Sequence, residues 1–492
     1  MSIKIISFLN QTEGSLKHKI IRSGFWVVIS NTFVRILEFI RSIFLARLLS
    51  PEIFGLWGIV NFIRQGIEIF TQTGFGAALI HRQEKVREAA DVAWTLNIGR
   101  GFILSILCFL AAPFVAQFYN RPILEILLKI VSLSFIIKGF RNINVILLQK
   151  ELDFKKIAIL EQITAFLGII ITIILAYILR NVWALVWGTM AFFTLDCILS
   201  YIIQPLKPKF YFEEKLTKEI FRYGIFITGS GIVIFLTTEL DNALVGKVLG
   251  MEALGYYVLA YTLANLPATQ ITHVVSRVMF PAYSQVQNDL EKLKTLYLKT
   301  LKLVATFAVP AAAGLFVLAP EIIKVVYGER WAPAIPALRV LCIFGMIRAI
   351  GATNGPLFNA IGKPNIIFYT TSLKLASILL IIYPLTKLYG IIGTALAVTI
   401  PMVVLTLVNW SILSYQIRLK KILLLKAITP SAICSFIMAT LVYLINNYIQ
   451  YFLTISLCSI INLVLIGIFI YFSILYAINR ETFLLLKKFK NV

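Results

Sequence analysis

The sequence predicts an all-α protein that crosses a membrane many times, and three observations support this fold class. Apolar residues make up 59% of the 492 residues and charged residues only 14%, whereas soluble domains carry about 25% charge. Apolar runs long enough to span a bilayer as a helix recur along the whole chain. The polar connections between these runs are short. Helices are required because lipid cannot satisfy the open edges of a β-sheet.

We expect about fourteen membrane spans, arranged as two parallel lobes of six helices followed by two C-terminal helices. The approximate ranges are 23–45, 54–79, 92–113, 123–148, 157–179, 182–204, 220–246, 253–280, 297–319, 335–358, 365–386, 389–413, 426–446 and 452–478. The sequence ATNGP interrupts span 10, and Pro267 and Pro310 lie inside other spans. Membrane proteins tolerate such breaks where neighbouring helices or water satisfy the freed backbone groups.

The predicted domain boundaries follow from these spans. They comprise a cytoplasmic N-terminal segment (1–22), an N-lobe (23–204), a cytoplasmic linker (205–219), a C-lobe (220–413), a cytoplasmic loop (414–425), spans 13 and 14 (426–478) and a basic cytoplasmic tail (479–492). The N-terminal segment has a short apolar patch and no small-residue cleavage site, so we interpret it as a surface helix and not as a secretory signal.

Basic residues in the loops predict the orientation of the chain. The N-terminal segment, the C-terminal tail and the loops on the same side contain 27 lysine and arginine residues, and the opposite loops contain 7. Because cytoplasmic loops are enriched in these residues, both termini should face the cytoplasm, as an even number of spans requires. The net charge of +23 is distributed over these loops, which argues against a nucleic-acid partner.

Several other functional classes are not supported by the sequence. The five cysteines lie scattered in apolar runs without a CxxC or Cys/His cluster, and there are only three histidines. We therefore expect small buried hydrophobic cysteines and no metal site. The phosphate-binding sequence GxxxxGK[ST] is absent, as is any catalytic constellation. The sequence predicts a protein that is not an enzyme and has no cofactor.

An internal repeat relates the two lobes. ARLLSPEIFGLWGIV resembles GKVLGMEALGYYVLA at an offset of 200 residues, and LLKIVSLSFIIKGFRNINVILLQK resembles ALRVLCIFGMIRAIGATNGPLFNA at an offset of 210. In the second pair Lys138 aligns with Arg348, and Asn144 with Asn354. Six spans separate equivalent positions, so both halves have the same orientation in the membrane. This predicts a transporter whose midplane site between the lobes opens to each side in turn.

Ionisable residues inside the predicted spans are the main candidates for a functional site. Each costs about 2.5–3.5 kcal/mol to insert at the centre of a span, and such residues usually face a bundle interior or a wet cavity. The candidate substrate-binding cations are Arg35, Arg41, Arg64, Arg100, Lys138, Arg141, Arg277 and Arg348. The candidates for ion coupling or counter-charge are Glu38, Glu68, Glu239 and Asp241.

The first four spans contain seven basic residues but few acidic ones, with Glu38 and Glu68 as the candidate counter-charges, which predicts an anionic guest or a water-filled vestibule. Arg35, Glu38 and Arg41 recur every three residues and can face one cavity. Arg64 and Glu68 have the i,i+4 spacing of a helical ion pair. Arginine suits phosphate because it can donate two parallel hydrogen bonds.

Two structural alternatives remain open for these charges. The basic residues could form interhelical ion pairs, or could extend from the span ends to the membrane surface, as Arg277 could. Glu239 and Asp241 in span 7 could bind a proton or Na⁺, or could pair with arginines of the other lobe.

The N-terminal stretch carries a resemblance to a known family. FWVVISNTFVRILEFIRSIFLARLLSPEIFGLWG, followed by GFGAALI before a charged loop, resembles the start of Wzx-type polysaccharide exporters. These belong to the multidrug/oligosaccharidyl-lipid/polysaccharide (MOP) flippase superfamily, which includes the MATE transporters. LVGKVLGMEALGYYVLAY and LFNAIGKPN extend the resemblance over nearly the whole chain. The most similar group is that of the colanic-acid and teichuronic-acid exporters.

The resemblance implies a flippase of the bacterial inner membrane. It would move an undecaprenyl-diphosphate-linked oligosaccharide, the repeat unit of a surface polysaccharide, to the outer leaflet by alternating access. The implied partners are this lipid-linked glycan, membrane lipids, the polysaccharide polymerase and the chain-length machinery. Related flippases hold the diphosphate with arginines of spans 1, 2 and 8, which match Arg35, Arg41, Arg64 and Arg277 here. In some relatives spans 13 and 14 line a groove for the lipid tail.

Two other classes of protein were weighed against this interpretation. A cation-coupled multidrug exporter of the same superfamily would favour an acidic, apolar cavity, and the N-lobe is basic. A membrane-embedded glycosyltransferase or polymerase would need acidic catalytic residues, usually with large loops outside the membrane. All loops predicted in this sequence are short.

Overall fold

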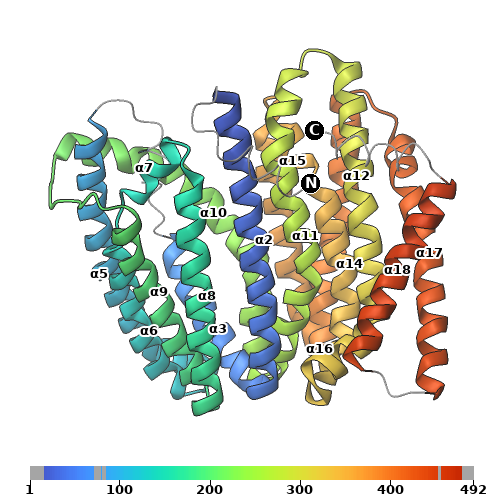
Figure 1. Cartoon of the computed structure of the whole chain (residues 1–492), viewed down its shortest axis with the longest axis horizontal. Helices are drawn as coiled ribbons and strands as arrows, with labels where there is room; N and C mark the ends of the chain where they lie inside the picture. The colour runs from blue at the N-terminus through green and yellow to red at the C-terminus, as the bar shows by residue number, and fades with distance from the viewer. Residues whose placement is uncertain (1–15, 71–78, 80–84, 453–455, 479–492) are drawn as a thin grey trace, which may run out of the picture. The chain divides into compact units, whose positions relative to one another are not determined.

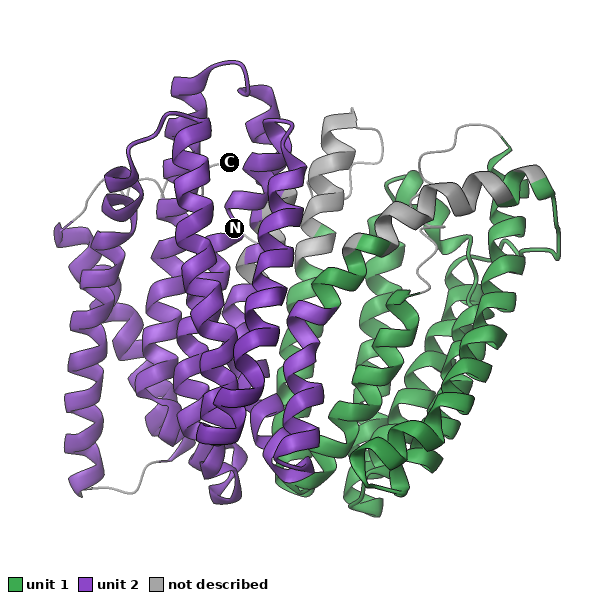
Figure 2. Cartoon of the chain, turned by 180° about the vertical axis from the view of Figure 1, so that it is seen from behind, with its two compact units in different colours: residues 1–235 green, residues 236–492 purple. Residues whose placement is uncertain are grey.

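The computed structural model describes residues 16–70, 79, 85–452 and 456–478, and every regular element within these ranges is a helix. The chain divides into two compact units, Met1–Phe235 and Leu236–Val492 (Figures 1 and 2). The boundary lies within one long helix, and not in the linker 205–219 that the sequence suggested. The basic tail 479–492 and residues 1–15 of the N-terminal segment lie outside the described residues.

Among its described residues the first unit has seven helices and the first part of an eighth. These are α2 (Leu16–Leu48), α3 (Pro51–Phe70), α5 (Val86–Tyr119), α6 (Ile123–Gly139), α7 (Val145–Lys150), α8 (Phe154–Leu179), α9 (Trp183–Ile203) and the start of α10 (Glu214–Val248). Helix α8 packs against both α2 and α9, and α5 packs against α6 (Figure 1).

Local sequence explains several of the helix ends. Asn120 and Arg180 end α5 and α8 in the left-handed conformation, with φ of 54° and 49°. This conformation turns the backbone out of the helix while its N–H still bonds to the last turn. The Asp153 carboxylate accepts a hydrogen bond from the Lys156 N–H at the start of α8, at 3.4 Å, as is usual for an N-cap aspartate.

The second unit contains the rest of α10 and ten further elements. These are α11 (Met251–Gln285), α12 (Leu290–Val317), the short helices α13 (Ala319–Glu321), η1 (Ile322–Tyr327) and η2 (Glu329–Ala334), then α14 (Ile335–Gly351), α15 (Asn354–Ala360), α16 (Pro364–Gln416), α17 (Lys421–Phe452) and α18 (Leu457–Ile478). Helix α16 covers two predicted spans and bends between them at Gly390, whose φ of 58° and ψ of −141° are not helical. Glycine adopts this conformation at the lowest cost.

The helices present apolar surface outward, as a lipid environment requires. Large side chains such as Phe102, Ile106, Phe109 and Phe114 are exposed along α5. Within the described residues, nine helical stretches are long and apolar enough to cross a membrane. The chain is therefore a multi-pass, all-α membrane protein, and the predicted fold class is confirmed. The helices at predicted spans 1, 4, 7 and 8 are not among the nine, so the count of fourteen stays a prediction.

In each unit the fourth predicted span is a broken helix. Residues 140–144 separate α6 from α7, and residues 352–353 separate α14 from α15. The interruption predicted in span 10 is present, but the uninterrupted span 123–148 was wrong. The offset of 210 residues that aligns the two sequences places Asn144 on Asn354, so the two breaks coincide. This agreement supports the internal repeat.

Buried amide groups hold the break in the first unit. The Asn142 side chain is fully buried and donates to the carbonyl oxygens of Gln204 and Leu206, at 2.7 and 2.9 Å. Its backbone N–H donates to Ser200 Oγ at 3.0 Å, and Asn144 Nδ2 donates to Leu206 O at 3.1 Å. These bonds replace the helical ones lost at the break and fasten it to the end of α9.

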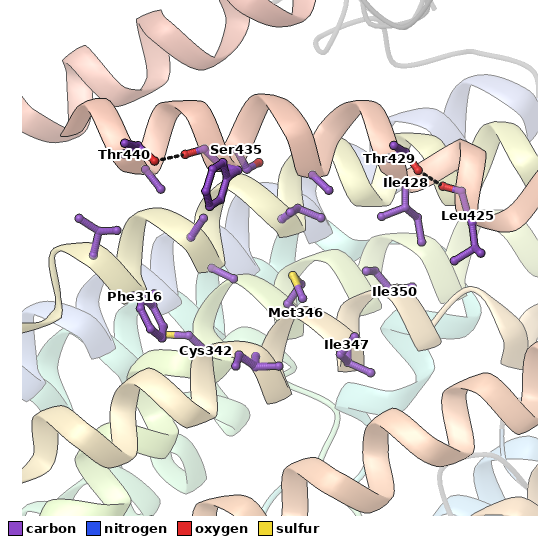
Figure 3. A pocket seen from close by; sticks show the side chains of 18 of the residues that line it. Phe316, Cys342, Met346, Ile347, Ile350, Leu425, Ile428, Thr429, Ser435 and Thr440 are labelled. Carbon is purple, nitrogen blue, oxygen red and sulfur yellow. Dashed lines mark hydrogen bonds between the residues drawn. The ribbon is translucent and has the colours of Figure 1, made fainter. Parts of the chain in front are cut away.

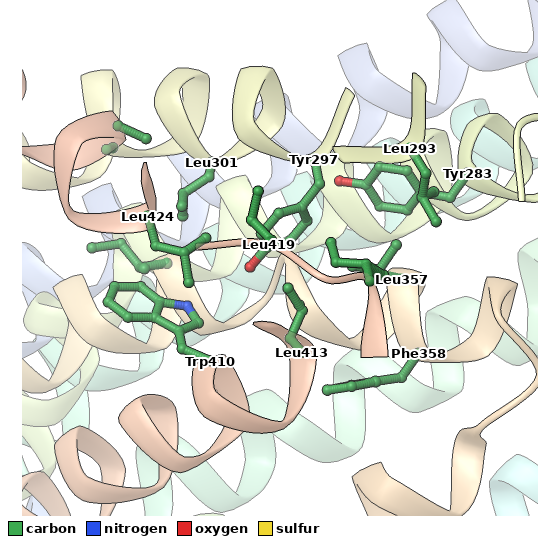
Figure 4. Close-up of a cluster of buried hydrophobic side chains, with 14 of the residues drawn as sticks. Tyr283, Leu293, Tyr297, Leu301, Leu357, Phe358, Trp410, Leu413, Leu419 and Leu424 are labelled. Atoms are coloured by element: carbon green, nitrogen blue, oxygen red, sulfur yellow. The ribbon is translucent and has the colours of Figure 1, made fainter. Parts of the chain in front are cut away.

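A large buried cluster forms part of the core of the second unit. Tyr283, Tyr297, Phe358 and Trp410 pack together with leucines from α12, α15, α16 and α17 (Figure 4). The Tyr297 hydroxyl donates to Asn354 Oδ1 at 2.7 Å, which attaches the start of α15 to α12. The cluster therefore fixes the broken helix of this unit in place.

Candidate functional site

The close packing of α5 and α6 depends on two glycines, and it positions two of the predicted cations. A Cβ atom on Gly101 would lie 2.7 Å from the carbonyl oxygen of Phe135, and one on Gly139 would lie 3.0 Å from that of Asn97. Any larger residue would push the helices apart. Arg100 and Lys138 directly precede these glycines in the sequence, so the contact brings both side chains near α3.

Glu68 on α3 gathers three of the predicted cations. Its Oε1 forms an ion pair with Lys138 Nζ, and its Oε2 lies 3.4 Å from Arg64 Nη1. Arg100 Nη2 donates to the Glu68 carbonyl oxygen at 2.9 Å. The predicted Arg64–Glu68 pair is therefore present, but it is part of a larger group. We call Arg64, Glu68, Arg100 and Lys138 the Glu68 cluster.

An aromatic ring from α9 supports the Glu68 cluster. Phe193 lies beneath both Arg64 and Lys138, with its ring centroid 5.4 Å from the Arg64 Cζ and 5.2 Å from the Lys138 Nζ. A cation over an aromatic face is stabilised even where water is scarce. Phe193 was not among the site residues predicted from the sequence. It lies three residues before Asp196, so both side chains are on the same face of α9, and this spacing could have indicated Phe193 as a neighbour of the charged residues.

Two of the seven cations in the first four predicted spans pair with carboxylates other than Glu38 and Glu68. Arg141 Nε lies 2.7 Å from Asp196 Oδ2, and Lys129 Nζ lies 2.6 Å from Glu125 Oε1. The other five are Arg35, Arg41, Arg64, Arg100 and Lys138, and the carboxylates on their helices nearest to them are Glu38 and Glu68. The predicted surplus of positive charge is therefore reduced by pairing and not removed.

The charges of α2 form a separate group. Arg35 Nη1 and Glu38 Oε2 form an exposed ion pair at 2.8 Å. Arg41 makes no ion pair within the described part of the chain. The carboxylate that acts on it electrostatically is that of Glu38, three residues earlier on the same helix. No hydrogen bond or ion pair joins these residues to Glu68 among the residues that the structure describes. The predicted cations of the first unit therefore fall into an α2 group, the Glu68 cluster and the separate Arg141–Asp196 pair.

The candidates of the second unit have neutral partners. Arg348 Nη1 donates to Asn265 Oδ1 at 2.8 Å. Asp241 is buried and accepts a hydrogen bond from the Tyr257 hydroxyl at 2.6 Å, and Glu239 accepts one from Asn242 Nδ2 at 2.8 Å. The Arg277 side chain lies outside the described residues.

The second unit also contains an apolar cavity of about 840 Å³ between α12, α14 and α17 (Figure 3). Phe316, Met346 and Ile428 lie among its walls. The hydroxyls of Thr429 and Thr440 donate to backbone carbonyls of their own helix, at 2.7 and 3.0 Å. These hydroxyls are satisfied within the protein, so the lining suits hydrocarbon.

This architecture is the fold of the MOP superfamily. The structure is similar to that of the lipid II flippase MurJ in its inward closed conformation, with a TM-score of 0.71 and 18% identity, over 92% of this chain and 98% of that one. It is also similar to an inward-facing multidrug resistance MATE family transporter of the MOP superfamily, with a TM-score of 0.63 and 16% identity, over 85% and 98% of the two chains. At these identities the likeness shows the fold alone.

Sequence comparison then gives the family. Residues 44–336 match the profile of the polysaccharide biosynthesis protein family, and the chain belongs to that family. It is 28% identical over 411 residues to the lipopolysaccharide biosynthesis protein WzxC of Escherichia coli K12, covering 83% of this chain and 82% of that protein. The resemblance to Wzx-type flippases is thereby confirmed. The prediction of a transporter and not an enzyme agrees with these relatives.

Proposed function

We propose that this chain is a flippase that moves an undecaprenyl-diphosphate-linked oligosaccharide from the inner to the outer leaflet by alternating access. The cations of the first unit would hold the diphosphate or an anionic sugar. The Glu68 cluster is the observation that carries this proposal. It gathers three cations and one carboxylate in helices that are otherwise apolar, where each unpaired charge is costly.

The geometry of the Glu68 cluster suits a phosphate ligand. Arg64 Nε is buried and has no hydrogen-bond partner among the described residues, so it can donate to an oxygen of the ligand. Arg64 and Lys138 are already positioned over Phe193, so little side-chain entropy is lost on binding. In the empty protein Glu68 would act as a counter-charge, and a diphosphate would supply the negative charge that the cluster lacks.

The same charges argue against a cationic drug as the substrate. An organic cation near Arg64, Arg100 and Lys138 would meet three like charges and one carboxylate. Like charges at these separations repel by several kcal/mol in a partly buried site. An acidic substrate headgroup therefore fits the first unit better than a cationic one.

We further propose that the apolar cavity of the second unit holds part of the isoprenoid chain. Its walls include α17, which lies in the predicted span 13. Burial of apolar surface lowers the free energy of a hydrocarbon by about 25 cal/mol for each Å² removed from water. An isoprenoid tail inside the apolar cavity would therefore be more stable than a tail exposed to water. Phe436 and Tyr443 of α17 line the cavity and would contact the chain.

The remaining assignments are also proposals. The excess of basic residues in one set of loops supports an inner-membrane protein with both termini in the cytoplasm. Glu239 and Asp241, which are hydrogen-bonded by neutral groups, are candidates for proton or Na⁺ coupling. The polysaccharide polymerase and the chain-length machinery are the proposed protein partners. The division into an N-lobe (23–204) and a C-lobe (220–413) remains our interpretation of the repeat.

Charge reversal tests the proposed function. In the cell that makes the glycan, Arg64→Glu and Arg35→Glu should each abolish surface glycan while the protein is still found in the membrane at normal levels. Lys207→Glu, an exposed change of the same kind outside the helices, should leave the glycan unchanged. Normal glycan output from a chain with both arginines reversed would refute the role of these cations.

A further inference from the structure

A second cavity, of about 500 Å³, lies in the second unit at the break between α14 and α15. Helices α11 and α16 supply its other walls. The polar side chains that line it are Thr272, Asn354, Asn359, Thr370, Thr371 and Asn409. None of the described side chains of its lining carries a charge. The cavity therefore differs in chemistry from the Glu68 cluster and from the apolar cavity of the same unit.

Two buried polar atoms of this lining lack partners within the described residues. They are Asn354 Nδ2, a donor, and Asn409 Oδ1, an acceptor. Asn354 as a whole is only 3% exposed. Buried amide groups are almost always hydrogen-bonded, so unpaired ones indicate a ligand or water. Hydroxyl groups can satisfy both kinds of atom, because a hydroxyl accepts hydrogen bonds and donates one.

Asn354 is held rigidly in this position. Its Oδ1 accepts a hydrogen bond from the Tyr297 hydroxyl at 2.7 Å, and Tyr297 is fully buried in the core cluster (Figure 4). Thr353 beside it donates to the Ile350 carbonyl oxygen at 2.8 Å. With Oδ1 engaged, the two Nδ2 hydrogens have a fixed direction. A ligand would therefore meet a preorganised donor.

The internal repeat shows that the corresponding break of the first unit has different side-chain partners. The counterpart of Asn354 is Asn144, whose Nδ2 donates to Leu206 O at 3.1 Å. In the first unit the break is also filled by the buried side chain of Asn142. The counterpart of Asn142 is Ala352, a small residue that lines the cavity. The same broken helix is thus fastened by two amide side chains in the first unit, whereas in the second unit an alanine and an unpaired amide donor border the cavity.

We infer that this cavity binds an uncharged sugar residue of the transported oligosaccharide. Neutral amides and hydroxyls match sugar hydroxyls, and the rings of Phe280 and Phe358 match the apolar faces of a pyranose. The volume lies within the range of about 300–1,000 Å³ that is usual for small-molecule sites. This inference rests on the proposed function and adds to it a site for the sugar.

The test uses the full chain in nanodiscs and two probes. One probe is undecaprenyl diphosphate without a sugar, and the other is the lipid-linked oligosaccharide extracted from the cell that produces this chain. The unaltered protein should bind the glycosylated lipid more tightly. Asn409→Leu should weaken binding of the glycosylated lipid about tenfold, the effect of one or two lost hydrogen bonds, and should leave the bare lipid unaffected.

Two more variants keep the test decisive if Asn409→Leu does not fold. Thr371→Val keeps its shape and should produce a smaller loss of the same kind. Ala352→Asn should fill the cavity as Asn142 fills the first unit, and should abolish the preference for the glycosylated lipid. Ser411→Ala, on the same helix as Asn409 but outside the lining, is the matched control and should behave like the unaltered chain.

The outcomes separate this inference from the proposed function. If the unaltered chain binds both lipids equally and Asn409→Leu and Thr371→Val change neither affinity, the cavity holds water only and the inference is refuted, while the proposed function stands. If the unaltered chain binds neither lipid, the proposed function fails, and the inference fails with it. A loss confined to the glycosylated lipid supports both.

Discussion

Glu68→Gln is the sharpest perturbation of the Glu68 cluster. It keeps the size of the side chain and removes the carboxylate that contacts Lys138 and Arg64. At the 3.4 Å between Arg64 Nη1 and Glu68 Oε2, Coulomb's law with an effective dielectric constant of about 20 gives an attraction of about 5 kcal/mol. The side chains of Arg64 and Glu68 remain 13% and 29% exposed, so solvent screens part of this energy. We expect a net loss of about 1–3 kcal/mol in stability.

A second substitution distinguishes lost attraction from general damage. In the unaltered chain, Lys138→Met removes a partner of Glu68 and should destabilise the protein. In the Glu68→Gln chain the same change removes a cation that has lost its carboxylate, and it should restore stability. The double variant should therefore be more stable than Glu68→Gln alone. The coupling energy should reach about 1 kcal/mol or more, as expected for residues in contact.

The assay is thermal unfolding of the purified chain in detergent, followed by tryptophan fluorescence. Undecaprenyl diphosphate should raise the melting temperature of Glu68→Gln more than that of the unaltered chain, because the anion replaces the missing counter-charge. The control is Glu151→Gln, an exposed carboxylate outside the cluster. If the effects of Glu68→Gln and Lys138→Met simply add, the two residues are not electrostatically coupled and the reasoning is wrong.

Three further predictions concern packing and orientation. Gly101→Ala places a methyl group 2.7 Å from Phe135 O and should cost about 1–3 kcal/mol, whereas Gly99→Ala, with open space around it, should leave the melting temperature unchanged or raise it. Asn142→Ala leaves the carbonyl of Gln204 without its donor and should lower the melting temperature by an amount equivalent to about 1–3 kcal/mol. A fluorescent protein fused to the C-terminus should fluoresce and an alkaline phosphatase fused there should be inactive; the opposite pattern would reverse the proposed orientation.

The helical architecture could be predicted because lipid imposes simple rules on the sequence. Apolar runs give the helices, and the ATNGP sequence gives the break before α15, since glycine and proline interrupt a helix locally. The break after α6 could not be found in this way. GFRNIN contains no proline, and its conformation depends on Asn142 bonding to Gln204 and Leu206, which lie more than sixty residues away. Long-range contacts of this kind leave no periodic signal in one sequence.

The same distinction separates the predicted from the unexpected parts of the candidate site. Arg64 and Glu68 lie four residues apart on one helix, so their pairing follows from helical geometry. The approach of Arg100 and Lys138 to Glu68 requires α5 and α6 to pack at Gly101 and Gly139. That contact depends on the tertiary packing of the two helices and cannot be read from the spacing of residues along the chain. The sequence therefore identified the cations but could not say which of them share a carboxylate.

The repeat explains how a single chain can present two kinds of binding chemistry. Lys138 and Arg348 are equivalent positions, yet Lys138 contacts a carboxylate and Arg348 contacts the amide of Asn265. The offset of 200 residues places Ala268 at the position of Glu68, so the acidic partner exists in one unit only. The broken helix is common to both units, although different side chains hold it in each. This difference leaves a group of cations around Glu68 in the first unit and a neutral polar cavity in the second, which under the proposed function would meet the charged and the uncharged parts of the ligand.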